Sequence, residues 1–296
     1  MGLVAHRIEQ AREQRGAALM GVLNVTPDSF YDGGRYLDLD AAVEHVDQLL
    51  RDGADIIDIG GESSRPRAEP VSAREQIARV EGAVRAAVAR GALVSIDTTS
   101  PEVADFALSL GAALVNDVSC LADTELARVA ARHHAVLILM HARGSMQQMA
   151  GFSRYPEAAY GDVTSDVLDE WRSARDRALT AGLDKDAVWL DPGIGFAKNA
   201  RQSLSLLSNL ERFSGEGVPV VVGASRKSFI NAVDQAPPEH RLGGSLAASL
   251  LAVEKGASVV RVHDVSEMRQ ALAVAHAIRH GAPLASAARP AEVPHA

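Results

Sequence analysis

Seven short apolar segments of this chain each end at a polar residue that is suited to binding or catalysis. Those residues are Asn24, Asp97, Asn116 with Asp117, His141, Asp191, Lys227 and His263. An eighth segment, 56–60, leads into a glycine-rich stretch that carries Glu62, Ser64 and Arg65. Because the carboxyl ends of the strands in a parallel barrel open at one mouth, we expect these side chains to share a cavity.

Four of these residues offer the hydrogen bonds that a flat nitrogen heterocycle needs. Asp97, Asn116 and Asp191 supply acceptors and one amide, and Lys227 supplies a donor. A ligand that left such buried groups unpaired would lose roughly 1 to 3 kcal/mol for each of them. We therefore interpret the four as one binding set. The alternative is that single members bond to the backbone or to each other across the barrel.

Arg261 and His263 form a second group, which we interpret as a cationic cluster. They alternate on one predicted strand, so their side chains point to the same side. Asp264 or Ser266 is expected to cap the helix that follows. Free N–H groups at a helix start and a nearby guanidinium together favour a phosphate, so this group predicts a diphosphate site. The alternative for Arg261 is an ion pair at the rim with Asp264 or Glu267.

Metal-ligand patterns are sparse in the sequence. There is no H-x-H after the first predicted strand and no H-E-x-x-H motif, which argues against a common transition-metal site. Mg²⁺ is compatible, held through Asn24, substrate phosphates and water. Cys120 is the single cysteine, so an intrachain disulfide is excluded; we expect a small buried side chain in a protein of a reducing compartment.

Predicted strands and helices alternate along the chain, and we count eight of each. The strands centre on 21–24, 56–59, 93–97, 113–116, 136–140, 188–191, 218–222 and 258–262, and the helices on 39–52, 73–90, 102–110, 124–132, 156–181, 202–213, 244–256 and 266–279. Strands that are apolar throughout indicate a parallel sheet that is buried on both faces. Eight such repeats favour a TIM (β/α)8 barrel. An open doubly wound sheet is the alternative, but no G-x-G-x-x-G turn follows the first strand.

Length and composition favour one large α/β domain. The chain has 296 residues, 47% of them hydrophobic, and a net charge of −8, which argues against a nucleic-acid partner. We expect a charged N-terminal extension at 1–16, the barrel at 17–281 and a disordered tail at 282–296. No apolar run approaches the ~20 residues that span a bilayer, and the first residues do not resemble a secretory signal. Small-molecule partners, no membrane and a cytoplasmic location are therefore expected.

In order, the motifs of this chain resemble those of dihydropteroate synthases. The resemblance extends from about residue 19 to about residue 279. The matching motifs are NVTPDSF at 24–30, DGG at 32–34, DIGGESSRP at 58–66, SIDT at 95–98, ND at 116–117, LMH at 139–141, DPGIGFAKN at 191–199, SRKS at 225–228 and RVHD at 261–264. The resemblance implies a TIM-barrel transferase that joins para-aminobenzoate to 6-hydroxymethyl-7,8-dihydropterin diphosphate, releasing diphosphate and forming 7,8-dihydropteroate for folate synthesis.

The resemblance also implies roles for individual residues and for the assembly. Asn24 would hold Mg²⁺, and the pterin would lie among Asp97, Asn116, Asp191, Lys227 and Phe196. The diphosphate would contact Ser64, Arg261 and His263, and para-aminobenzoate would lie near Arg65, Pro66 and Ser225. Asp97, Lys227, Arg261 and His263 are the predicted catalytic residues. The resemblance further implies two mobile early loops, a target of sulfonamides and a homodimer formed by late helices.

Some positions depart from the family pattern. Tyr31 and Arg67 lie in the two early loops, where Ser and Gly are more frequent, and Asn231 replaces a usual Gly. None of them belongs to the predicted pterin set, so loop closure is the property that they put in doubt. Two alternatives stay open: a methyltransferase that uses methyltetrahydrofolate, and a paralogue that binds pterin without catalysis.

Overall fold

Eight parallel strands form the centre of the structure, which is a computed structural model that describes residues 2–26, 35–62, 70–144 and 154–281. The strands are β1 (Ala18–Asn24), β2 (Ile56–Gly60), β3 (Leu93–Asp97), β4 (Leu114–Asp117), β5 (Val136–Met140), β6 (Val188–Asp191), β7 (Val221–Val222) and β8 (Val259–Val262). Nearly all their residues are buried, as expected for a sheet that is covered on both faces.

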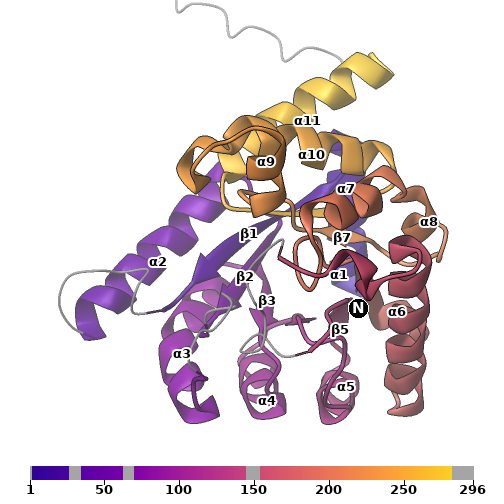
Figure 1. The fold of residues 1–296 in the computed structure, drawn as a ribbon. Coiled ribbons are helices and arrows are strands. Elements are labelled where there is room, and N and C mark those ends of the chain that lie inside the picture. The colour runs from indigo at the N-terminus through magenta and orange to yellow at the C-terminus, as the bar shows by residue number, and fades with distance from the viewer. Residues whose placement is uncertain (1, 27–34, 63–69, 145–153, 282–296) are drawn as a thin grey trace, which may run out of the picture.

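The sheet curls into a nearly closed barrel. Its strand order is β6-β5-β4-β3-β2-β1-β8-β7, and every pair is parallel. A parallel bridge between Leu190 of β6 and Val220, next to β7, joins the two ends of this order. In Figure 1 the strands occupy the middle of the molecule and the helices surround them. The predicted single α/β barrel is confirmed.

Helices follow the strands around the barrel. They are α1 (Gly2–Arg15), α2 (Arg35–Asp52), α3 (Ala73–Ala89), α4 (Pro101–Ser109), α5 (Glu125–Arg132), α6 (Val163–Thr180), α7 (Ala200–Ser208), α8 (Glu211–Ser214), α9 (Ser228–Val233), α10 (Leu242–Glu254) and α11 (Val265–His280). Short 3-10 helices, η2 to η4, cover Glu157–Ala159, Lys185–Ala187 and Pro238–His240. Within the described residues, no helix is both long and apolar enough to cross a membrane.

Most predicted helices agree with the structure to within a few residues, and two do not. The predicted helix 156–181 begins only at Val163, because the side chain of Asp162 accepts a hydrogen bond from the Ser165 N–H and caps the helix there. The predicted helix 202–213 is wrong as a single element, since the chain turns at Asn209 between α7 and α8. Helix α9 was not predicted.

Helix α1 occupies the segment that sequence analysis treated only as a charged extension. Its buried side chains are Val4, Ile8 and Ala11. They pack in one apolar cluster with the first residues of the strands, among them Ala18, Ile56, Leu93, Leu114, Val136, Val221 and Val259. Helix α1 therefore covers the N-terminal end of the barrel, opposite to the end where the polar strand termini lie.

Candidate active site

The strand register aligns three of the predicted polar residues, Asn24, Asp97 and Asn116. Asn24 pairs with Gly60, Gly60 with Asp97, and Asp97 with Asn116, across four neighbouring strands. Asp191 ends β6 and pairs with Met140 of β5. The carboxyl ends of these strands therefore form one polar rim, as sequence analysis predicted.

Arg261 is at the centre of this rim. Its Nε donates to Asp58 Oδ2 at 2.6 Å, and its Nη2 donates to Asp97 Oδ2 at 2.8 Å. Asn116 Nδ2 donates to the same Asp58 oxygen at 3.0 Å. The predicted alternative for Arg261, an ion pair with Asp264 or Glu267, is wrong. The guanidinium points into the barrel because the carboxylates of the buried Asp58 and the partly buried Asp97 compensate its charge there.

Asp58 is a site residue that sequence analysis missed. Its side chain is fully buried inside β2, and its Oδ1 has no hydrogen-bond partner among the described residues. The predicted site residues lie at the ends of apolar segments, whereas Asp58 lies within its segment. The available signal was a lone carboxylate inside an otherwise apolar strand, which is rarely buried without a partner or a ligand.

Burial and charge act against each other on Asp97. Burial raises the pKa of Asp97 to about 7; Arg261 opposes this rise, and the carboxylates of Asp58 and Asp117 add to it. The direct bond to Arg261 favours the ionised form. The ionisation of Asp97 therefore depends on its contact with Arg261.

Lys227 approaches the same rim from beyond β7. It stands at the N-terminus of α9 rather than on a strand, and its Nζ donates to the Ile194 carbonyl at 2.5 Å. The ammonium lies 4.5 Å from the centre of the Phe196 ring, within cation–π range. Burial lowers the pKa of Lys227 to about 8, while Asp191 opposes the shift. Burial raises the pKa of Asp191, and the charge of Lys227 opposes this shift.

His263 and Ser225 contact each other at the edge of the rim. Ser225 Oγ lies 3.0 Å from His263 Nδ1. Desolvation and the guanidinium groups of Arg261 and Arg226 lower the pKa of His263 to about 4. The imidazole is neutral near pH 7, so the predicted cationic cluster contains one cation, Arg261.

The helix cap predicted beside this pair is absent. Asp264 stands at the N-cap position of α11, but its side chain makes no capping hydrogen bond. Its carboxylate instead binds Arg226, whose Nε donates to Asp264 Oδ2 at 3.0 Å. The Arg226 guanidinium engages both oxygens of the Asp264 carboxylate, which accounts for the missing cap.

Two of the polar strand ends serve the framework. The Asp117 carboxylate accepts bonds from Ser119 N, Ser119 Oγ and Leu121 N, and so shapes the turn after β4. His141 is fully buried, and its ring bonds to Lys198 and to Glu170 of α6. The expectation that His141 lines the mouth is therefore wrong. Cys120, in the turn after β4, is half-buried.

The chain matches known proteins over most of its length. The family model described as "Pterin binding enzyme" matches residues 20–263. The dihydropteroate synthase of Bacillus subtilis is 44% identical over 252 residues, which cover 84% of each chain. The chain belongs to the dihydropteroate synthase family.

Solved structures of dihydropteroate synthases have the same fold. The Xanthomonas albilineans dihydropteroate synthase with 4-aminobenzoic acid aligns with a TM-score of 0.82 and 39% identity, over 89% of this chain and 93% of that one. The same enzyme in complex with 7,8-dihydropteroate aligns with a TM-score of 0.79 and 37% identity, over 89% and 94%. The sequence identities of 37% and 39% show that these proteins share the family of this chain as well as its fold.

Part of the site expected of a dihydropteroate synthase lies outside the described residues. Ser64, Arg65 and Pro66 fall in 63–69, and Tyr31 and Arg67 fall in the two early loops. Of the remaining predicted residues, Phe196 and Ser225 are buried beside the rim. The exposed Asn24 stands at the end of β1.

The described residues offer few ligands for a metal ion. They contain no group of three or more His, Cys, Asp or Glu that could hold one. Asn24 contributes one exposed amide oxygen at the rim. A single oxygen suits Mg²⁺, which keeps several waters and takes its other ligands from substrate phosphates.

Proposed function

We propose that this chain joins para-aminobenzoate to 6-hydroxymethyl-7,8-dihydropterin diphosphate, releasing diphosphate and forming 7,8-dihydropteroate in folate biosynthesis. The observation that carries the proposal is the polar rim formed by Asp58, Asp97, Asn116, Asp191, Lys227 and Arg261. Family membership supplies the reaction, and the rim supplies the chemistry that this reaction needs.

The pterin is assigned to the carboxylate side of the rim. Asp97 and Asp191 accept hydrogen bonds from the ring N–H and amino groups, while Asn116 and Lys227 donate to ring nitrogens and the carbonyl oxygen. The Phe196 ring, which lies beneath Lys227, offers an apolar face to the flat heterocycle. The free Oδ1 of Asp58 is a further buried acceptor for this ligand.

The substitution takes place at the pterin methylene and needs no enzyme nucleophile. As the bond to diphosphate breaks, positive charge develops on the methylene and spreads into the electron-rich ring. The carboxylate of Asp97 stabilises this charge. The amine of para-aminobenzoate then attacks the methylene carbon and loses a proton. Ser225, Arg65 and Pro66 are assigned to the approach of this second substrate.

Arg261 and His263 are assigned to the departing diphosphate. Within the described part of the chain, the bonds of Arg261 to the carboxylates engage Nε and Nη2, and we assign Nη1 to the diphosphate. His263 contributes one N–H of a neutral imidazole. Ser64 joins this group on the second early loop. Mg²⁺ held at Asn24 would neutralise charge on the leaving group when bound.

The assembly and location are also proposals. Val274 and Ile278 lie one turn apart on α11 and are 55% and 79% exposed, and Leu251 of α10 is 55% exposed. Large exposed apolar side chains on neighbouring helices support a homodimer formed by the late helices. A cytoplasmic location agrees with the folate pathway and with the lone Cys120.

Growth of cells that lack their own dihydropteroate synthase tests the function against both alternatives. The gene for this chain should restore growth without folate end products. A pterin-binding paralogue without catalysis, or a methyltransferase that uses methyltetrahydrofolate, would fail to restore growth although the protein accumulates in soluble form.

A further inference from the structure

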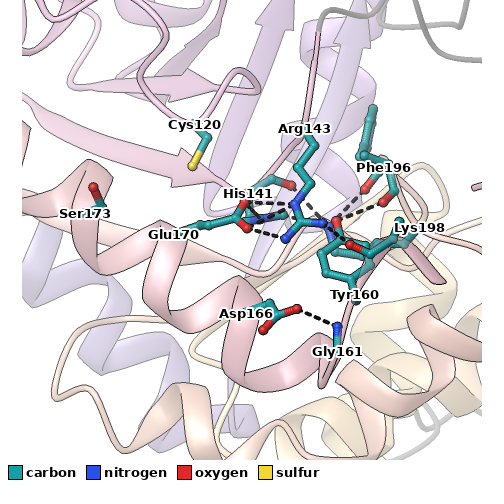
Figure 2. Close-up of polar contacts among 12 residues, drawn as sticks. Cys120, His141, Arg143, Tyr160, Gly161, Asp166, Glu170, Ser173, Phe196 and Lys198 are labelled. Carbon is teal, nitrogen blue, oxygen red and sulfur yellow. Dashed lines mark hydrogen bonds and ion pairs between the residues drawn. The ribbon is translucent and has the colours of Figure 1, made fainter. Parts of the chain in front are cut away.

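A second polar cluster, made of His141, Arg143, Glu170 and Lys198, is separate from the rim residues assigned to the proposed reaction; Figure 2 shows its side chains. Lys198 and His141 are fully buried. Lys198 Nζ lies 2.9 Å from His141 Nδ1, and His141 Nε2 lies 2.9 Å from Glu170 Oε2. Arg143 Nε donates to Glu170 Oε1 at 3.0 Å. The four side chains form a continuous chain of hydrogen bonds.

The hydrogen-bond partners of His141 determine which of its two ring nitrogens carries the proton. Burial and the nearby Lys198 lower the pKa of His141 to about 4, so the ring is neutral at pH 7. Since Glu170 is ionised and only accepts, the ring proton is on Nε2 and Nδ1 accepts from Lys198. Lys198 also donates to the carbonyls of Phe196 at 2.9 Å and of His141 at 3.3 Å. Burial lowers the pKa of Lys198 to about 7. In the charged form of Lys198, these three bonds use all three of its N–H groups.

These bonds hold the connection between β6 and α7, residues 192–199. Gly193 is so close to the cluster that an added Cβ would lie 2.0 Å from the His141 carbonyl oxygen. Its φ of +68° and the φ of +46° at Ala197 are left-handed, and Ala197 has a Cβ that disfavours this conformation. The hydroxyl of Tyr160 donates to the Ala197 carbonyl at 2.9 Å. Contacts from outside the connection therefore maintain a strained backbone.

The same connection provides the surroundings of Lys227. The Ile194 carbonyl accepts from Lys227 Nζ at 2.5 Å, and the Phe196 ring lies 4.5 Å from that ammonium. Lys198 binds the Phe196 carbonyl from the other side. The same short stretch of backbone thus contacts both Lys227, at the rim, and Lys198.

We propose that Lys198, held by His141 and Glu170, is a positioning residue that fixes the 192–199 connection so that the ammonium of Lys227 is aimed at the pterin. Its removal takes one donor from each of three buried acceptors: His141 Nδ1 and the carbonyls of His141 and Phe196. The loss of these bonds is costly, so the connection relaxes toward other partners and Ile194 and Phe196 move with it. The inference rests on the proposed function, because it concerns the pterin pocket of that reaction.

A double-mutant cycle between Lys198→Met and Lys227→Met tests the proposal. In the wild-type background, Lys198→Met should raise KM for the pterin diphosphate roughly fivefold or more, the equivalent of one lost hydrogen bond, and leave KM for para-aminobenzoate within about twofold. In the Lys227→Met background, the same change should have less than about a twofold effect. Lys185→Met, at an exposed lysine of η3, is the matched control and should leave both KM values unchanged.

Equal effects in the two backgrounds, or equal effects on both KM values, would overturn the proposal, because a merely structural role predicts additivity. If Lys198→Met does not fold, the cycle is run with Lys198→Gln. That variant keeps one donor for the Phe196 carbonyl and should show a smaller, still non-additive, effect.

Diphosphate release by the wild-type protein separates the two proposals. If the wild type is active and the cycle is additive, only the role of Lys198 fails. If the wild type is inactive, the proposed function fails, and the cycle is measured on the equilibrium Kd for 6-hydroxymethyl-7,8-dihydropterin. Additivity in that Kd would likewise overturn the positioning role.

Discussion

Arg261 determines the electrostatics of the rim at the scale of single residues. It is the guanidinium that the carboxylates of Asp58 and Asp97 share. Removing one partner of a buried ion pair is costly, since the remaining charge keeps its desolvation penalty. Asp58 and Asp97 nevertheless differ in exposure: Asp58 is fully buried and Asp97 reaches the mouth. We therefore expect stability to depend on Asp58 and catalysis on Asp97.

Replacing Asp97 by Asn removes the charge that is proposed to stabilise the developing cation, while it preserves the side-chain size. Turnover in a diphosphate-release assay should fall at least about tenfold, with a smaller loss of pterin binding. Asp105→Asn, at an exposed carboxylate of α4, is the control and should be neutral. An unchanged rate in Asp97→Asn would exclude its catalytic role.

The variant Asp58→Asn should lower the free energy of unfolding by about 2 kcal/mol, because Arg261 keeps one carboxylate and loses the other. Urea denaturation measures this effect. Glu81→Gln breaks an exposed i,i+4 pair with Arg85 and should cost less than about 0.5 kcal/mol. Equal midpoints for the two variants would show that the Asp58 pair is no more important than a surface pair.

The cluster around His141 gives the protein a pH-dependent stability. In the unfolded chain the imidazole has its ordinary pKa of about 6.5, and burial lowers the pKa of His141 to about 4 in the folded chain. Between these values the unfolded state binds more protons, so the free energy of unfolding falls as pH falls from about 6.5 to about 4. Glu170, with its pKa lowered to about 2 chiefly by the hydrogen bond from His141, extends the loss to lower pH.

Denaturation midpoints measured at pH 7, 6, 5 and 4 test this linkage. The His141→Gln variant should show a shallower fall than the wild type over this range. A residual slope is expected from His263, whose pKa is also lowered. The exposed His6→Gln is the control and should keep the wild-type slope. A wild-type slope in His141→Gln would mean that this ring does not titrate with unfolding.

At the scale of elements, helix α1 separates stability from activity. It closes the end of the barrel opposite to the rim, and Ile8 is 4% exposed there. The variant Ile8→Ala should lower the free energy of unfolding by about 2 kcal/mol and leave both KM values unchanged. Leu3→Ala, at a side chain that is 60% exposed, is the matched control and should change stability little. A rise in KM for Ile8→Ala would contradict the separation.

The elements show which parts of the fold were predictable. Strands β2 to β6 were predicted nearly to the residue, because buried parallel strands form uninterrupted apolar runs between the helices. Helix α1 was missed because its buried face has only Val4, Ile8 and Ala11 among charged residues. That face is stabilised by packing against the N-terminal end of the barrel. This is a tertiary contact, which the local sequence does not show.

The sequence also indicated where several polar side chains of the rim lie. Asp97, Asn116 and Asp191 lie at or next to the carboxyl ends of strands, as predicted, whereas Lys227 precedes a helix. Asp58 was missed because it lies within a strand. Lys198 escaped notice because its partner, His141, is 57 residues away in the sequence. Pairings of this kind depend on the packed structure and leave no periodic pattern.

At the scale of the whole molecule, the proposed site lies at one end of the barrel, and α10 and α11 carry exposed apolar side chains. The predicted homodimer should be visible by light scattering after gel filtration. The double variant Val274→Lys and Ile278→Lys should shift it to monomer, because it places four charges in the interface of each dimer. Leu204→Lys, at an apolar side chain of α7 that is 40% exposed, tests whether the interface includes α7. A wild type that is monomeric at micromolar concentration would contradict the dimer.

Diphosphate release from 6-hydroxymethyl-7,8-dihydropterin diphosphate, measured with and without para-aminobenzoate, tests the central claim most directly. The proposed function predicts release that depends on para-aminobenzoate and is matched by an equal amount of 7,8-dihydropteroate. No release under either condition, from protein that is folded and binds the pterin, would contradict it.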